Sequence, residues 1–241
     1  MRSILAKTAI AALLLAGAYS SANAGSLQVE PVLIDVTAAG AAASTLTLHN
    51  AGSAPINAQV RVFRWSQQNG EEKLEPTDAV AASPPVLTLG PNAKNIVRII
   101  RLSKQPIVGE ESYRLLIDQL PDLSQQKNGG INLMVRYSIP VFFGARNKKS
   151  PTLAWSVAVK GSKVTLSARN TGERRLRISA LTVRDARGHT ISLGAGLAGY
   201  TLGQSTKSWT IPGHGFAASG SASISAQSDG GPVQAVASIE H

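Results

Sequence analysis

The chain has 241 residues, with 24 lysines and arginines against 14 aspartates and glutamates, and it contains no cysteine. This length allows one or two domains that each bury a core. Without cysteine, no disulfide holds the fold and no thiolate can complete a zinc site. The formal net charge of +10 is spread over the chain and is not interleaved with aromatic residues. We therefore expect no nucleic-acid partner.

Residues 1–24 have the parts of a secretory signal peptide. Arg2 and Lys7 flank the start of an apolar run at residues 9–16, and residues 22–24 read Ala-Asn-Ala, a small-x-small cleavage pattern. The run is shorter than the ~20 residues that span a bilayer, so we expect removal rather than a membrane anchor. Loss of Arg2 and Lys7 lowers the formal net charge from +10 to +8. We expect no membrane insertion of the mature chain.

The rest of the chain reads as short strands. Segments rich in β-branched and aromatic residues alternate with turns built from Gly, Pro, Asn and Ser. No segment after the signal peptide has the period and length of an amphipathic helix. The strands predicted in the first half are residues 29–36, 44–50, 56–65, 95–102, 112–120 and 131–143. Those predicted in the second half are residues 153–159, 163–170, 176–184, 190–193, 207–211, 219–227 and 233–239.

A domain boundary is predicted at residues 144–151. This segment is basic and polar, and Pro151 prevents a strand from running through it. The number and spacing of the strands on either side favour antiparallel sandwiches. We therefore predict an all-β protein with one sandwich domain at residues 25–146 and a second at residues 147–241.

Residues 131–143 form the longest alternating segment of the chain. Its odd positions are apolar and project from one face of a strand. They are Ile131, Leu133, Val135, Tyr137 and Ile139. Such a strand is an aggregation hazard if it stays unpaired, and the loop before it, residues 125–130, has no apolar residue. The pattern therefore indicates a strand that pairs with another chain.

Catalysis and metal binding have little support in the residues. The four histidines, His49, His189, His214 and His241, are not spaced as metal ligands on one element. No Gly-x-Ser-x-Gly elbow precedes a helix, and no phosphate-binding loop is recognisable. Acid, base and nucleophile candidates do not converge. We therefore expect a protein that is not an enzyme and has neither a metal nor a cofactor.

Short motifs follow one another in a characteristic order along the first half. They are Asn50, Trp65, Ser83-Pro84-Pro85, the segment Pro91 to Arg98, Tyr113-Arg114-Leu115, Leu120-Pro121 and Ile139-Pro140-Val141-Phe142. This set resembles the periplasmic chaperones of the chaperone/usher pathway, which assemble pili in Gram-negative bacteria. The Ile-Pro-Val-Phe ending is similar to the branch that serves archaic or sigma-type, spore-coat-U-like fimbriae. The resemblance covers most of the first domain, whereas the second rests on strand content.

The resemblance implies two immunoglobulin-like domains in an L-shape. It also implies a periplasmic chaperone that binds pilus or fimbrial subunits and delivers them to an outer-membrane usher. In this family the subunit lacks its last strand, and the chaperone lends its own last first-domain strand, here residues 131–143, to fill the groove. The donor positions would be Ile131, Leu133 and Val135, with Tyr137 and Ile139 continuing the row. Each buried aliphatic donor contributes ~1.5–3 kcal/mol before the costs of ordering and association.

The resemblance departs from the best-known branch at one site. That branch binds the subunit's terminal carboxylate with an Arg in the first strand and a Lys late in the donor strand. The aligned positions here hold Leu33 (or Pro31) and Pro140, which carry no charge. By strand position, the candidate replacements are Arg136, Arg98 and Arg101. An arginine suits bidentate carboxylate binding, but each of these is equally well explained as a solvent-facing strand cation.

A structural surface protein of two sandwiches, or a pilus subunit itself, is the alternative function. A subunit of this kind needs an N-terminal donor extension, and we expect no room for one between Ala24 and the strand that begins near Leu27. Such subunits are also often disulfide-linked, whereas this chain has no cysteine. Both features favour the chaperone. Co-purification with a small fimbrial subunit would discriminate between the two functions.

Overall fold

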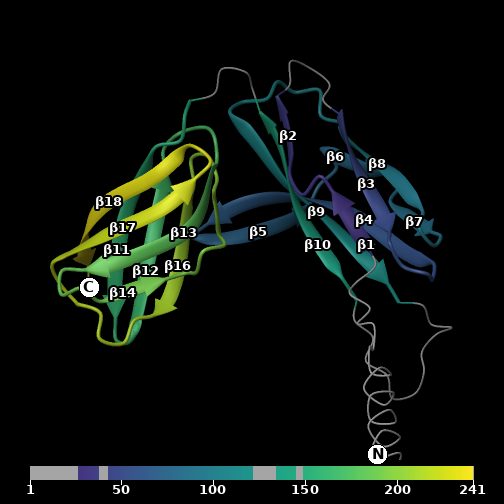
Figure 1. Cartoon of the computed structure of the whole chain (residues 1–241). Helices are drawn as coiled ribbons and strands as arrows, with labels where there is room; N and C mark the ends of the chain where they lie inside the picture. Colours follow the sequence, from purple (N-terminus) through teal and green to yellow (C-terminus); the bar gives the residue numbers. More distant parts are fainter. Residues whose placement is uncertain (1–26, 38–42, 122–133, 145–148, 241) are drawn as a thin grey trace, which may run out of the picture.

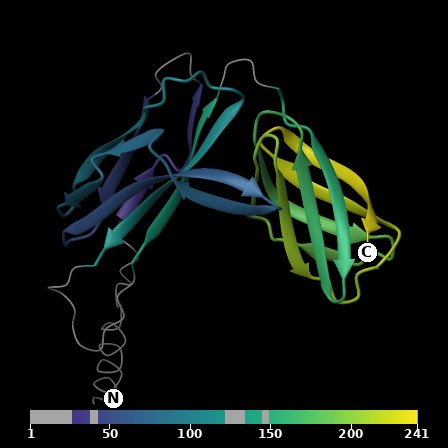
Figure 2. The ribbon, with the colours of Figure 1, turned by 180° about the vertical axis from the view of Figure 1, so that it is seen from behind.

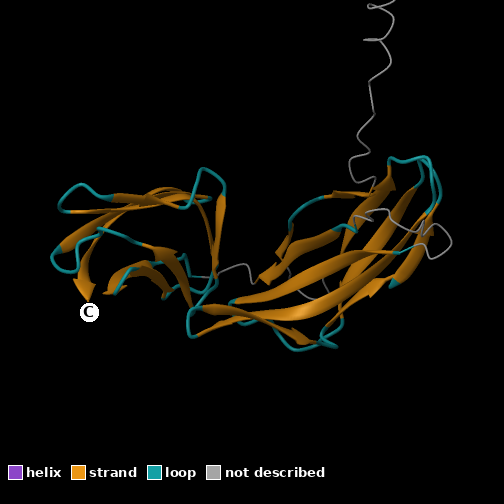
Figure 3. Ribbon diagram, turned by 90° about the horizontal axis from the view of Figure 1, so that it is seen from below, coloured by secondary structure: helices purple, strands orange, loops and turns teal. Residues whose placement is uncertain are grey.

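The computed structural model describes residues 27–37, 43–121, 134–144 and 149–240. All regular structure in these residues is β-strand (Figure 3). Figure 1 shows two domains inclined to one another, as expected for an L-shape. Within the described residues, no helix is long and apolar enough to cross a membrane.

The first domain consists of two facing sheets. Its strands are β1 (Leu27–Glu30), β2 (Ile34–Thr37), β3 (Ala43–Asn50), β4 (Ile56–Gln68), β5 (Glu71–Pro76), β6 (Val80–Ser83), β7 (Val86–Leu89), β8 (Lys94–Arg101), β9 (Glu110–Leu120) and β10 (Arg136–Gly144). One sheet has the order β1-β3-β8-β6, and the other has the order β2-β10-β9-β4-β5 with β7 beside β4. The core lies between them, where Leu48 and Val97 of the first sheet and Leu115 and Val141 of the second are fully buried.

The second domain is built from one continuous set of paired strands. These are β11 (Leu153–Lys160), β12 (Lys163–Asn170), β13 (Leu176–Asp185), β14 (Thr190–Ser192), β15 (Leu197–Thr201), β16 (Thr206–Pro212), β17 (Ser221–Ser228) and β18 (Gly231–Glu240). Their order is β14-β13-β17-β18-β11-β12-β16, with β15 beside β13. Leu166, Ile178, Val183 and Ile224 fill its core with no exposed surface. The last strand of the first domain ends at Gly144, and the first strand of the second domain begins at Leu153. The predicted boundary between residues 146 and 147 lies outside the described residues.

The predicted first strand, residues 29–36, is two strands in different sheets. β1 pairs with β3, whereas β2 pairs with β10. Pro31 lies between them and has no N–H group to donate, so the ladder stops there and the chain crosses to the other sheet. The predicted strand 131–143 is observed from Arg136 onward, and residues 131–133 lie outside the described residues. The sequence pattern also missed β5, β6, β7 and β15, which are short or strongly exposed.

Each domain has a buried asparagine at the end of a strand. In the first domain, the Asn50 side-chain amide donates to the carbonyl oxygens of Ala54, Leu89 and Gly90, and it accepts from the Gly52 N–H. In the second domain, the Asn170 side-chain amide donates to the carbonyl oxygens of Arg174 and Thr201, and it accepts from the Gly172 N–H. Asn50 and Asn170 are at most 1% exposed. The Asn50 motif is therefore a structural turn anchor and not part of a binding site.

Candidate functional site

β10 has a partner along only one edge over its first half. From Arg136 to Gly144, each residue pairs with β9 in antiparallel register. On the other edge, β2 pairs in parallel register only with residues 141–144. Among the described residues, no strand pairs with that edge between Arg136 and Pro140. The backbone N–H and C=O groups of this open edge can therefore pair with a strand from another chain.

The odd-numbered residues of β10 run into the core of their own domain. Ile139 is 4% exposed, and Val141 and Phe143 are fully buried in the same apolar cluster. Ile139 was expected to continue the donor row, but its side chain is already used in the core of the first domain. Its contacts in this structure are therefore intramolecular.

Tyr137 and Val135 lie where this row leaves the core. Tyr137 is half-buried against the cluster, and its hydroxyl donates to the Leu27 carbonyl oxygen at 2.5 Å. Val135 is half-buried just before the strand begins. Its carbonyl oxygen still accepts from the Gln119 N–H at 3.0 Å. The other two predicted donors, Ile131 and Leu133, lie outside the described residues.

The even-numbered residues of β10 form the opposite face of the sheet, which turns toward the second domain. Phe142 is fully buried there and packs on Tyr200 of the second domain, with ring centroids 5.8 Å apart. Pro140, one of the two uncharged anchor positions, lies one step earlier on this face. The other position, Leu33, immediately precedes the Ile34–Val141 pair, and its side chain packs against the same aromatic cluster. Both uncharged anchor positions therefore lie side by side on the face that turns toward the second domain.

Arg136 begins β10 on this same face and forms an ion pair with Asp118, its cross-strand partner on β9. Asp118 also accepts from Arg61 Nη2 at 2.6 Å. Burial raises the pKa of Asp118, but hydrogen bonds from Arg136 and Arg61 outweigh it and lower that pKa below its ordinary value. The Arg136 side chain is 62% exposed. Arg61, Asp118, Val135 and Arg136 line a hollow of about 410 Å³ that extends over β4, β9 and the start of β10.

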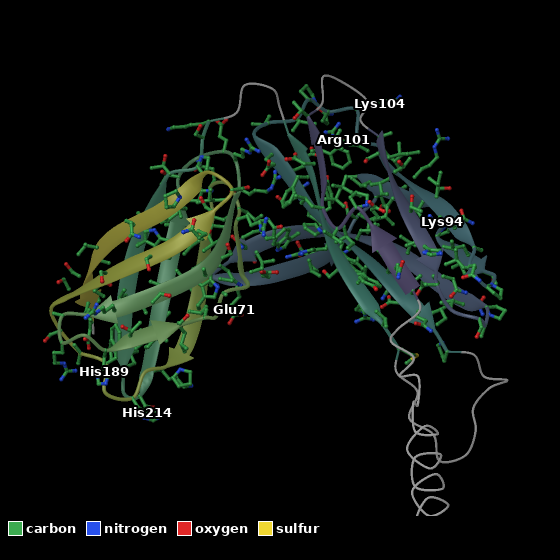
Figure 4. All side chains as sticks on the ribbon, in the orientation of Figure 1. Glu71, Lys94, Arg101, Lys104, His189 and His214 are labelled. Atoms are coloured by element: carbon green, nitrogen blue, oxygen red, sulfur yellow. The ribbon has the colours of Figure 1, made fainter. Side chains whose placement is uncertain are left out.

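Arg101 is a structural residue and not a free cation. Its side chain is 3% exposed and binds both carboxylate oxygens of Glu111, at 2.8 Å each. It also donates to the carbonyl oxygens of Ser103 and Gln105. Because Arg101 belongs to β8 and Glu111 to β9, the pair connects the two sheets. Figure 4 shows the position of Arg101 in the first domain.

Arg98 lies on the other sheet from β10. It is exposed on β8, opposite Thr45 of β3 and Ser83 of β6. Arg98 is therefore not on a strand that pairs with β10, because β8 belongs to the β1-β3-β8-β6 sheet. Of the three predicted cations, only Arg136 lies on β10 and on the face that holds Pro140.

Arg114 was missed as a candidate, although it belongs to the Tyr113-Arg114-Leu115 motif. It lies on β9 directly opposite Pro140. Its guanidinium carbon is 3.8 Å from the centre of the Trp65 ring, and Nη2 is 3.5 Å from a Glu72 oxygen. Burial, the largest cause, lowers the pKa of Arg114. The pairing register of β9 against β10 identifies Arg114 as the neighbour of Pro140, but this register cannot be derived from the residue pattern of a single strand.

Comparison with known proteins identifies the fold family. The family model for pili and flagellar-assembly chaperones, PapD N-terminal domain, matches residues 26–146. The chain belongs to this family. The family that the motifs predict is therefore confirmed, and it is a family of chaperones and not of enzymes.

Solved structures with the same fold cover both domains of the chaperone. One is a chaperone–tip adhesion subunit pre-assembly complex, CsuC–CsuE, from archaic Csu pili of Acinetobacter baumannii, with 26% identity and a TM-score of 0.67. That match covers 89% of this chain and 98% of the other, and it agrees with the predicted archaic branch. The SafA pilin–SafB chaperone complex of Salmonella enterica matches with 20% identity, a TM-score of 0.60 and coverages of 88% and 97%. No curated protein sequence matched the chain.

Proposed function

We propose that the protein is a periplasmic chaperone that binds pilus or fimbrial subunits by donor-strand complementation and delivers them to an outer-membrane usher. The open edge of β10 between Arg136 and Pro140 carries this proposal. An edge with unpaired backbone groups next to an alternating apolar row fits strand addition by a partner. The Acinetobacter and Salmonella matches are complexes with a tip adhesion subunit and a pilin, which supports a subunit as the partner here.

The apolar donors in this proposal are the residues that precede the core. Ile131, Leu133 and Val135 project in one direction if the strand continues with the register of β10. Tyr137 forms the transition between the donor row and the domain core, because it packs on that core. Three buried aliphatic side chains at ~1.5–3 kcal/mol each supply a large part of the gross affinity. The backbone pairing along the open edge sets the direction of the guest strand.

Arg136 and Arg114 are the proposed contacts for the subunit's terminal carboxylate. Arg136 lies on β10 two positions before Ser138 and four before Pro140, and its side chain extends into solvent. Arg114 lies across the strand from Pro140 and is held flat against Trp65. A carboxylate that enters beside Pro140 therefore meets a preformed guanidinium on the next strand. In the free protein Arg136 pairs with Asp118 and Arg114 with Glu72, so a guest carboxylate would compete with these two partners.

The route to the periplasm rests on residues 1–24, which lie outside the described residues. Their charge, apolar run and Ala-Asn-Ala ending support a cleaved signal peptide. The proposal predicts a mature N-terminus at Gly25.

The test is isolation of the full-length protein, with a C-terminal affinity tag, from the periplasm of its own bacterium. Mass spectrometry would identify bound proteins and give the intact mass of the chain. The proposal expects a small fimbrial subunit in a stoichiometric complex and a chain that begins at Gly25. A protein recovered without any subunit under conditions of pilus expression would contradict it.

A further inference from the structure

The β4–β5 hairpin crosses from the first domain to the second, as Figures 1 and 2 show from opposite sides. We call β4, β5 and the turn between them the cross-domain hairpin. Its turn, Asn69-Gly70, has both φ angles positive, at 54° and 83°, as a two-residue hairpin of the favoured twist requires. The Gly70 carbonyl oxygen accepts from the Ser208 N–H of β16 at 2.9 Å. A Cβ at Gly70 would lie 2.3 Å from Ser208 Oγ, so the tip is in direct contact with the second domain.

Gln67 joins the hairpin to the second domain with both ends of its amide. Its Nε2 donates to the Tyr200 carbonyl oxygen at 2.6 Å, and its Oε1 accepts from the Leu202 N–H at 2.9 Å. The residue is 8% exposed. Gln67 therefore hydrogen-bonds two backbone groups of buried residues in the other domain.

An aromatic cluster lies next to this amide. Trp65 of the hairpin is 5.7 Å from Tyr200 and 5.7 Å from Phe142, measured between ring centroids. Trp65 and Phe142 come from the first domain and Tyr200 from the second. All three are at most 5% exposed. Phe142 belongs to β10, so the strand with the open edge is itself packed into the domain interface.

Arg175 makes a second contact between the domains, on other strands. Its side chain is 3% exposed and donates to Glu110 of β9 at 2.5 Å and to Asp35 of β2 at 2.6 Å. Its guanidinium carbon is 3.8 Å from the centre of the Phe142 ring. Arg175 thus contacts the three strands β2, β9 and β10 from the second domain. A single contact would allow one domain to rotate about it relative to the other. Two contacts at different places, which here both include Phe142, restrict the angle between the domains.

We propose that the cross-domain hairpin and Arg175 together fix the angle between the domains, with Gln67 and Arg175 as positioning residues for the guest-binding edge of β10. The importance of that angle for guest binding rests on the proposed function. The angle itself does not, because it is a property of the free protein. Removing Gln67's amide takes away the side-chain hydrogen bonds to the Tyr200 and Leu202 backbone groups, which weakens one of the two contacts.

The angle is measured by spin labels in the free chain. The protein has no cysteine, so Lys94→Cys on β8 and His214→Cys in the second domain give two specific label sites. Both residues are exposed and lie far apart on the two domains in Figure 4. Double electron–electron resonance of this pair is expected to give one narrow distance distribution. Gln67→Ala and Arg175→Met should each broaden it, and the matched variant Gln234→Ala, at an exposed glutamine of β18, should not.

Gln67→Glu separates positioning from general loss of structure. The introduced carboxylate accepts from the Leu202 N–H but repels the Tyr200 carbonyl oxygen, so the distribution should broaden at pH 7. When protonated, the same group donates to Tyr200 and accepts from Leu202, as the amide does. Burial raises the pKa of a carboxyl group, so the distribution should narrow again as the pH falls toward about 5. A narrow distribution at both pH values, or a broad one at both, would overturn the role of Gln67.

Guest binding is the second readout, with the subunit that co-purifies with the unaltered chain as the probe. Gln67→Ala should weaken its capture at least tenfold while circular dichroism shows folded domains. Unchanged distance distributions in Gln67→Ala and Arg175→Met would contradict the inference, whatever the guest does. If no subunit co-purifies with the unaltered chain, the proposed function fails, and the distance measurement still decides whether the angle is fixed.

Discussion

Pro140 of β10 lies directly opposite Arg114 of β9, on the face of the sheet that turns toward the second domain. The aligned cation of the better-known branch is missing at Pro140, yet a guanidinium is present one strand away. Trp65 holds that guanidinium in place, with its carbon 3.8 Å from the ring centre. The sheet thus has a positive charge on β9 directly beside Pro140.

If residues 131–135 form a donor row, substitutions on the two faces of this strand should have very different effects on subunit capture. Leu133→Asp or Val135→Asp should abolish subunit capture, because a charge placed in a dry groove costs several kcal/mol, more than the lost aliphatic group supplied. Asn132→Asp, on the opposite face, should have a much smaller effect. Periplasmic co-purification with the subunit measures all three. Thermal unfolding of each free variant serves as the control for folding, and equal losses from both faces would indicate misfolding instead of a lost donor.

The carboxylate contacts predict a salt-dependent loss of binding. Arg136→Ala and Arg114→Ala should each weaken subunit binding by about 1.5–3 kcal/mol, or roughly tenfold to more than a hundredfold. The loss should be larger at low than at high salt for Arg136, which is the more exposed of the two. Arg169→Ala, at an exposed arginine of β12, is the matched control. Affinities for the purified subunit that equal those of the unaltered chain at both salt concentrations would place the anchor elsewhere.

Asp118→Asn distinguishes a binding role of Arg136 from a structural one. Asp118 now holds Arg136 and Arg61 by ion pairs. If Arg136 binds the guest carboxylate, removing its internal competitor should leave affinity unchanged or increase it. An affinity as low as that of Arg136→Ala would show that the Arg136–Asp118 pair only shapes the strand.

Arg101 should matter for stability and not directly for binding. Arg101→Ala leaves the half-buried Glu111 carboxylate without its bidentate partner, and loss of such a charge-assisted pair costs about 1.5–3 kcal/mol. Urea unfolding should therefore show a much lower midpoint. A variant with unchanged stability and lost subunit binding would instead return Arg101 to the list of anchors.

The ionisation of Glu111 should make the free energy of unfolding depend on pH. Burial raises its pKa, but hydrogen bonds from Arg101 and Tyr113 outweigh it, so the folded-state pKa lies below the ordinary value. A lowered pKa stabilises the fold at pH values above the unfolded pKa of about 4.3, and that stability is lost as the pH falls through the folded pKa. The free energy of unfolding should thus decrease below about pH 4–5. Glu111→Gln should show a flatter pH dependence by denaturant titration, and an equally steep curve would contradict this role.

The all-β architecture and most strands of both domains follow from alternation and turn chemistry. Segments such as 56–65 and 112–120 contain a regular period and clear breaks, so their positions were predicted within a few residues. β5 was missed because all six of its residues are exposed and its stability comes from pairing with β4 and contact with the second domain. β1 and β2 were merged because an apolar pattern does not show a change of sheet.

The sequence predicts which residues of one strand share a face, but it does not predict which residues of neighbouring strands lie beside them. The alternation of residues 131–139 indicated a donor row, yet only the fold shows that Ile139 lies in its own core. Arg98 and Arg114 illustrate the same limit. Predicted strand position suggested Arg98, whereas the register of β9 against β10 brings Arg114 beside Pro140. Such neighbours depend on long-range pairing, which a single sequence does not display.

The most direct test of the account is hydrogen–deuterium exchange of residues 134–140, measured in the free chain and in its complex with the co-purified subunit. The N–H groups of residues 134–139 that point to the open edge should exchange quickly in the free protein and become strongly protected when a guest strand pairs with them. The N–H groups already bonded to β9 should be protected in both states, and Pro140 has no N–H to report. Residues 141–144, already paired on both edges, should change little and serve as the internal reference. Equal exchange of residues 134–140 in the free chain and in the complex would contradict donor-strand pairing along β10.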